Sequence, residues 1–174
     1  HKDKLSNELI EVGKNIVKAC DSLPLSLKII GIYLRDKKIL RCWNNFTSLI
    51  IFDIYGFSSL TSLSNKLDNF ISLTTLNMNK CSSLILMLNE LDNLTSLTTL
   101  NMEWYKSLTL LLNKLYNFTS LIILNISGCS SLMSLLNELD NLISLTTLNM
   151  KYKSLTLLPN ELGNLTSFTT LNMK

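Results

Sequence analysis

The chain has 174 residues, of which 47% are hydrophobic, and it carries a net charge of +3 at pH 7. This composition suits a globular protein with a substantial core. The 16 basic and 13 acidic residues give no support for nucleic-acid binding, which usually requires a concentrated basic stripe. No apolar run reaches the roughly 18 to 20 residues of a membrane-spanning helix, so we expect neither a nucleic-acid nor a membrane partner.

Residues 1–41 are predicted to form a short helical segment. A first helix is indicated by apolar residues that fall on one helical stripe, namely Leu5, Leu9, Val12, Ile16 and Cys20. A second helix is predicted to begin near Pro24, because proline suits the first turn of a helix. Its apolar residues recur at helical spacing, at Leu23, Leu27, Ile30 and Leu34. We expect these helices to cover the edge of the first strand.

Residues 42–174 are built from a repeat. The segment LTTLNM begins at Leu73 and returns at Leu97 and Leu145, with LIILNI at Leu121, so that the copies follow one another at a constant interval. A looser copy, LIIFDI, begins one interval earlier at residue 49, and FTTLNM begins at residue 168 after a repeat that is one residue shorter. Self-similarity at a fixed period is typical of stacked repeats. The sequence therefore predicts six parallel strands in one register.

Each copy alternates apolar and polar residues, as a half-buried strand does. In the copy at residue 73, Leu76 and Met78 are expected to face the core, while Thr75 and Asn77 face outward. The return segments, such as residues 87–94, have apolar residues at spacings of three to four and predict a short helix or 3-10 turn on the convex side. Stacking the copies predicts one continuous interior row, formed by Leu76, Leu100, Leu124, Leu148 and Leu171.

The copies share the frame LxxLxMxxCxxLxxLxNELxNLxS. This frame resembles the leucine-rich-repeat signature LxxLxLxxN/CxL, with Cys81 and Cys129 at the N/C site. The resemblance implies an α/β fold, a solenoid of about six repeats with its parallel sheet on the concave face. The short helical segment that the apolar spacing predicts would precede this solenoid. The resemblance also implies a protein partner that binds on the concave face.

The cysteines indicate a reducing compartment. Cys81 and Cys129 lie two repeats apart, which is about 10 Å at the usual strand spacing, whereas a disulfide needs Cα atoms within about 7 Å. We therefore expect buried free thiols and a cytoplasmic protein. No metal site is expected, because the four cysteines, which include Cys20 and Cys42, lack close pairing and the single histidine is His1. Without an internal histidine as base, we expect no catalytic residues and no enzyme activity.

The run SLPLSL at residues 22–27 resembles the GLPLAL region in the nucleotide-binding NB-ARC domain of plant NLR disease-resistance proteins. Ser22 and Ser26 depart from that pattern. In the family the proline of GLPLAL packs near the adenine of bound ADP. Pro24 matches that proline, so the resemblance implies Pro24 as a cofactor-binding position. The chain contains no GxxxxGK[ST] phosphate loop. We therefore expect no bound cofactor, and ADP only if an upstream domain supplies that loop.

Candidate partner-binding residues occupy the two positions just after each strand. These positions vary between copies, whereas the outward Thr and Asn residues recur and indicate scaffold. Variable, exposed aromatic and charged side chains are typical of a recognition surface, although they could also simply decorate a solvated rim. We predict partner contacts at Tyr55, Lys80, Glu103, Trp104, Lys151 and Tyr152.

Together these features predict a non-enzymatic protein-interaction module, the ligand-sensing repeats of an intracellular NLR-like defence protein. Two alternatives remain open: a nucleotide-dependent signalling switch, which Pro24 favours, and an extracellular receptor ectodomain. The ectodomain is favoured by five NxS/T sites, at Asn45, Asn93, Asn117, Asn125 and Asn164. The last strand would leave an unpaired edge beside Lys174, so we also expect self-association through that edge.

Overall fold

A computed structural model covers the repeats and one earlier strand. It describes residues 25–28, 48–56, 58, 61, 70–84, 91, 93–105, 115–129, 139, 141–151 and 165–173. The first predicted helix lies outside these residues, as do Pro24, Cys20, Cys42 and Tyr152.

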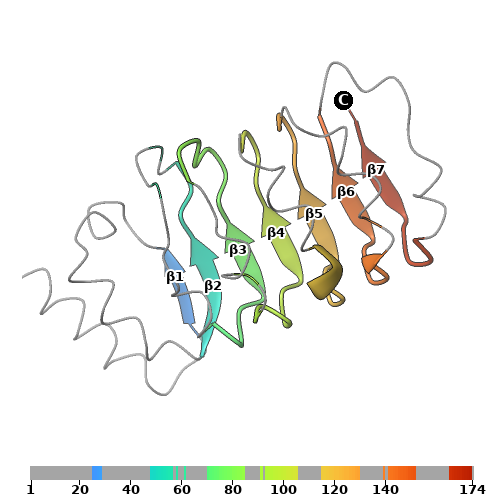
Figure 1. The fold of residues 1–174 in the computed structure, drawn as a ribbon, viewed down its shortest axis with the longest axis horizontal. Helices are drawn as coiled ribbons and strands as arrows, with labels where there is room; N and C mark the ends of the chain where they lie inside the picture. The colour runs from blue at the N-terminus through green and yellow to red at the C-terminus, as the bar shows by residue number, and fades with distance from the viewer. Residues whose placement is uncertain are drawn as a thin grey trace, which may run out of the picture.

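The described strands form one parallel sheet of seven strands in chain order (Figure 1). All six predicted strands are present, and successive copies pair with each other. The strands are β1 (Leu25–Lys28), β2 (Leu49–Asp53), β3 (Thr75–Asn77), β4 (Thr99–Asn101), β5 (Ile123–Asn125), β6 (Thr147–Asn149) and β7 (Thr170–Asn172).

The register of the sheet follows the period of the sequence. Leu76 in β3 lies opposite Leu100 in β4, one full period later, and the same offset places Leu124 opposite Leu148. Between β6 and β7 the offset is shorter by one, because Leu148 lies opposite Leu171. The one-residue difference in the last repeat therefore falls between the strands and does not disturb their pairing. Self-association through the last strand stays a prediction.

Strand β1 shows that the prediction of a second helix was wrong at these residues. The structure pairs Leu25–Lys28 in parallel with β2, with Leu27 opposite Phe52 and a register shift between Leu25 and Ser26. Residues 23, 25 and 27 are all leucine, so the segment also has the period of two that a strand requires. Pairing with the open edge of β2 satisfies backbone groups on both segments, which favours the strand.

The core lies behind the sheet, in rows of side chains that cross the strands. The predicted row is confirmed: Leu76, Leu100, Leu124 and Leu148 are fully buried, and Leu171 is partly buried against the same cluster. Phe52 extends this row into β2. Its ring meets that of Phe70 edge to face, with centroids 5.4 Å apart.

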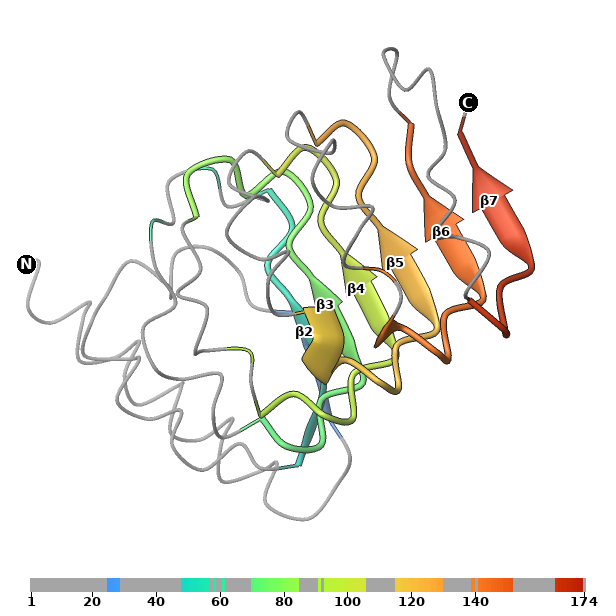
Figure 2. The ribbon, with the colours of Figure 1, turned by 45° about the vertical axis from the view of Figure 1, so that its right-hand side comes forward.

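The return segments contribute further buried rows on the convex side. The 3-10 helix η4 (Leu115–Asn117) lies in one of them, as the predicted turn required, and is the short coiled ribbon beside the sheet in Figure 2. Leu115 and the equivalent Leu91 and Leu139 are buried. Only part of the other return segments falls within the described residues.

Cys81 and Cys129 are buried thiols that form no disulfide among the described residues, as predicted. Each donates a hydrogen bond to a backbone carbonyl of the preceding repeat: Cys81 Sγ to Ile54 O at 2.9 Å, and Cys129 Sγ to Met102 O at 3.1 Å. Burial raises the pKa of the Cys129 thiol to about 11, so it stays a protonated donor well above neutral pH. The N/C site of the repeat therefore supplies a donor that bonds each of these repeats to the preceding one.

Candidate functional site

The turns that follow the strands are joined to one another by backbone hydrogen bonds. The N–H of Lys80 donates to the carbonyl of Glu103 at 2.8 Å, and the N–H of Trp104 donates to the carbonyl of Ser127 at 2.9 Å. These bonds continue the parallel ladder beyond each strand, so successive turns lie about 4.8 Å apart. We call these turns the post-strand rim, comprising residues 55–56, 79–80, 103–104, 127–128 and 151.

One position in the rim turns has a left-handed backbone. The φ angle lies between 60° and 79° at four equivalent residues, Gly56, Lys80, Trp104 and Gly128. Glycine adopts this conformation freely, whereas it costs any other L-residue roughly 1–2 kcal/mol. Lys80 and Trp104 are the only non-glycine residues with positive φ among those the structure describes. They place large side chains where glycine would be more stable.

Tyr55 and Lys80 form one contact pair on the rim. The Nζ atom of Lys80 lies 5.2 Å from the centroid of the Tyr55 ring, within the range of a cation–π contact. A hydrogen bond with the Tyr55 side chain is the main cause that raises the pKa of the Lys80 amino group, and the charge of Glu103 adds to it. The N–H of Tyr55 donates to Asp53 Oδ1 at 2.9 Å and steadies the turn. The pair therefore presents a cation on an exposed aromatic ring.

Trp104 lies against Gly128 of the next repeat. A β-carbon at residue 128 would come within 2.7 Å of two atoms of the indole, closer than real contacts allow. The exposed fraction of Trp104 is nevertheless 59%. The left-handed backbone at residue 128 and the indole packed on it therefore both favour glycine there. Most of the indole surface stays open to a partner.

A chain of hydrogen bonds runs from the rim into the outward asparagine row of the sheet. The N–H of Glu103 donates to Asn79 Oδ1 at 2.8 Å, and Asn125 Nδ2 donates to Glu103 Oε1 at 2.9 Å. The N–H of Ser127 donates to Asn125 Oδ1 at 3.3 Å, and the N–H of Lys151 donates to Ser127 Oγ at 3.2 Å. These bonds orient the Glu103 carboxylate and the Asn125 amide.

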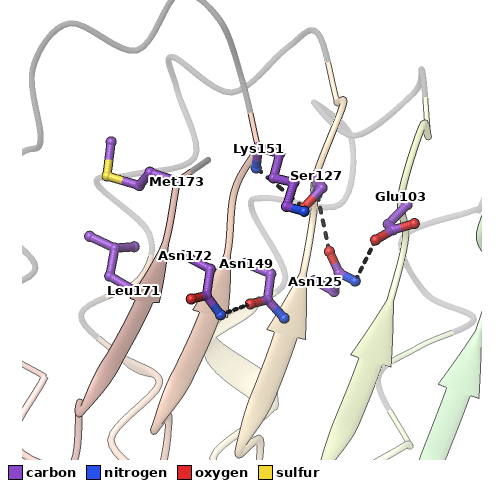
Figure 3. A pocket seen from close by; sticks show the side chains of 8 residues that line it. All are labelled: Glu103, Asn125, Ser127, Asn149, Lys151, Leu171, Asn172 and Met173. Carbon is purple, nitrogen blue, oxygen red and sulfur yellow. Dashed lines mark hydrogen bonds between the residues drawn. The ribbon is translucent and has the colours of Figure 1, made fainter.

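An open groove of about 670 Å³ lies beside Glu103, over strands β5 to β7 (Figure 3). Asparagines from three successive strands line it, and Asn172 Nδ2 donates to Asn149 Oδ1. In Figure 3, Asn125 and Ser127 stand between Glu103 and Lys151. We call this hollow the groove; it is lined by Glu103, Asn125, Ser127, Asn149, Lys151, Leu171, Asn172 and Met173.

The structure places five of the six predicted contact residues on the post-strand rim. It brings Tyr55 and Lys80 together, and it places Glu103 and Lys151 on the same groove. Sequence reasoning assigned the recurring asparagines to the scaffold, whereas three of them also line the groove. It missed the left-handed position as well, although glycine at two equivalent positions, Gly56 and Gly128, was a signal for it.

The described part of the chain holds no group of three or more His, Cys, Asp or Glu residues placed to bind a metal ion. Within the same residues, no helix has the length and apolarity needed to cross a membrane. The chemistry that the rim and the groove offer is instead that of noncovalent contact: exposed aromatic rings, two ammonium groups, one carboxylate and several amides.

The strand register that follows the repeat period, the parallel sheet and the buried thiol donors define a leucine-rich-repeat solenoid. No protein-family model matches the chain, and no curated protein does.

Solved structures that match this chain include two internalins of Listeria monocytogenes. InlF is 18% identical with a TM-score of 0.46, and the match covers 76% of this chain and 37% of InlF. InlC2 is 18% identical with a TM-score of 0.44, covering 80% of this chain and 66% of InlC2. A leucine-rich-repeat protein of Leptospira interrogans is 18% identical with a TM-score of 0.27, covering 79% and 51%. The chain spans less than two thirds of the length of each of these proteins.

Proposed function

We propose that the chain is a protein-interaction module whose post-strand rim contacts the partner through Tyr55, Lys80 and Trp104. The observation that carries this proposal is the left-handed backbone of Lys80 and Trp104. Strain of this kind persists only where the surrounding structure holds it, and it clusters at functional positions. Burial does not explain Trp104, because most of its side chain is exposed. An exposed aromatic beside a cation suits a binding hot spot, since rigid rings give contact area at low entropic cost.

More specifically, we propose that the chain forms the ligand-sensing repeats of an intracellular NLR-like defence protein. It is supported by the SLPLSL run at residues 22–27 and by the free thiols of Cys81 and Cys129, which fit a reducing compartment. In this form residues 1–174 act without a cofactor. Calorimetric titration of the chain with ADP is expected to give no binding heat, and saturable heat would instead favour the nucleotide-dependent switch.

The experiment that tests the rim uses a phage-displayed library of random peptides about 12 residues long, which in extended form cross the whole rim. Peptides selected on the wild-type chain are then titrated against Trp104→Ala and Tyr55→Ala. We expect affinity to fall by about tenfold or more in each variant, because each removes an exposed ring.

Ile143 provides a matched control for this experiment. It lies in the turn that precedes β6, at the opposite end of the strands, and its exposed fraction of 57% is close to that of Trp104. Ile143→Ala is expected to change affinity by less than about twofold. Peptides that lose as much affinity on Ile143→Ala as on Trp104→Ala would show that the rim is not the binding surface.

A further inference from the structure

The groove holds two opposite charges that do not neutralise each other. Glu103 and Lys151 follow strands β4 and β6, so one complete repeat with Ser127 separates them, about 10 Å at the usual strand spacing. Ser127 is buried, and both charged residues line the groove. Among the described residues, no ion pair joins Glu103 to Lys151. Each charge is therefore available to a bound molecule.

The carboxylate of Glu103 is held in place before any ligand arrives. Its backbone N–H is bound by Asn79 Oδ1, and its Oε1 atom accepts from the Asn125 amide. An ionised carboxylate has about four acceptor sites, so these bonds leave room for a cationic donor. Orientation by neighbouring amides lowers the entropic cost of forming an ion pair with a ligand.

Lys151 is held by its backbone and open at its side chain. Its N–H donates to Ser127 Oγ, and its carbonyl accepts from the N–H of Gly128 at 2.9 Å. The residue is exposed, and its ammonium group has no hydrogen bond or ion pair with the residues that the structure describes. It is thus a positive charge at a fixed backbone position on the groove.

We propose that the groove binds an extended peptide segment of the partner that carries a basic side chain facing Glu103 and an acidic side chain facing Lys151. The proposal rests on the proposed function, and it adds the chemical class of the ligand. In a polyproline II segment, which has three residues per turn, residues three apart lie on the same face and are separated by about 9 Å, which matches the separation of the two charges. The basic and acidic residues should therefore have two residues between them.

The lining of the groove fits the backbone of such a segment. The Asn125, Asn149 and Asn172 amides carry both donors and acceptors, and these match peptide N–H and carbonyl groups. A uniformly negative ligand, such as a nucleic acid, would be repelled by the carboxylate of Glu103. Charge complementarity therefore favours a peptide of mixed sign over a uniformly charged partner.

The test compares the wild-type chain with the charge-swapped variant Glu103→Lys/Lys151→Glu, using the displayed random-peptide library as the probe. Wild-type selections should be enriched in a basic and an acidic residue with two residues between them. These peptides should bind the swapped variant at least about tenfold more weakly, and synthetic peptides with the two charges exchanged should recover that affinity.

Glu103→Gln provides a second variant that preserves the fold, because its amide oxygen can still accept from Asn125. It should lose affinity for the selected peptides while its circular dichroism and unfolding midpoint match those of the wild type. Equal binding to the wild type and the swapped variant, or no enrichment of the charge pair, would overturn the groove proposal. The rim proposal is judged separately, because peptides could ignore the swap and still require Trp104.

Discussion

The indole of Trp104 occupies the space that a β-carbon on Gly128 would need, with two ring atoms within 2.7 Å of that position. The two residues hold the same position in successive repeats, and both have a left-handed backbone. One repeat thus uses a bulky residue at a strained position, and the next uses glycine and makes room for it. The left-handed backbone that the repeats share is thus coupled to the position of the exposed Trp104 side chain.

Gly128→Ala should destabilise the chain by about 1–2 kcal/mol and displace the indole. Most of that cost comes from the left-handed backbone, and the rest from the lost contact with Trp104. Urea unfolding gives the free energy, and tryptophan fluorescence reports the displacement. In the Trp104→Ala background the same substitution should cost less, since the clash is gone. Equal costs in both backgrounds would mean that the indole does not restrain residue 128.

Lys80→Gly should leave the chain as stable as the wild type or more so, although it removes an entire side chain. Glycine relieves the left-handed strain, while the lost contact with Tyr55 is solvent-exposed and weak. We expect the thermal midpoint to rise by about 1–3 °C. Lys151→Gly is the matched control, because φ is not positive at Lys151, and its midpoint should fall. A fall in both variants would show that no strain is stored at Lys80.

The period of the repeat was sufficient to predict six of the seven strands of the sheet. Leu76 and its equivalents recur once in every repeat, and the structure pairs them in that register. Strand β1 was missed because Leu23, Leu27, Ile30 and Leu34 fit a helical period over a long window, while the four residues of the strand give only a short alternating signal. The available edge of β2, a tertiary feature, decides between the two.

The candidate site was predictable only in part, because it depends on backbone geometry between repeats. Variation between copies located the rim, and the structure puts Tyr55 and Lys80 in contact there. Recurrence led to the asparagines being assigned a scaffold role alone. In the structure Asn125 has both a scaffold role and a role in the groove. It accepts a hydrogen bond from the N–H of Ser127, and it orients the carboxylate of Glu103. A side chain that serves two neighbours gives no separate signal in a linear comparison of copies.

Leu124→Ala should destabilise the chain by about 2–5 kcal/mol, because Leu124 is fully buried between two other repeats and its loss leaves a cavity. Leu171 belongs to the same row but is only partly buried in the last strand of the sheet. Leu171→Ala should therefore cost about 1 kcal/mol. Urea unfolding of the two variants measures the difference. Equal costs would contradict the assignment of the core to the middle repeats.

Cys129 should make the stability of the chain fall in alkaline solution. Burial raises the pKa of its thiol from 9.0 to about 11 in the folded chain. Between these values the unfolded chain has lost the proton while the folded chain still holds it, so the unfolded state binds fewer protons. The free energy of unfolding must then decrease as pH rises through this window, and the contribution is fully present below pH 9.

The measurement is the difference in the free energy of unfolding between the wild type and Cys129→Ser, followed from pH 8 to 11 by urea unfolding. Serine keeps a donor for the Met102 carbonyl but does not titrate here, so the other ionisable groups cancel in the difference. The difference should be constant up to about pH 9 and then fall steadily toward pH 11. A difference that does not change with pH would mean that water reaches the thiol, and that Cys129 is less enclosed than the buried donor described above.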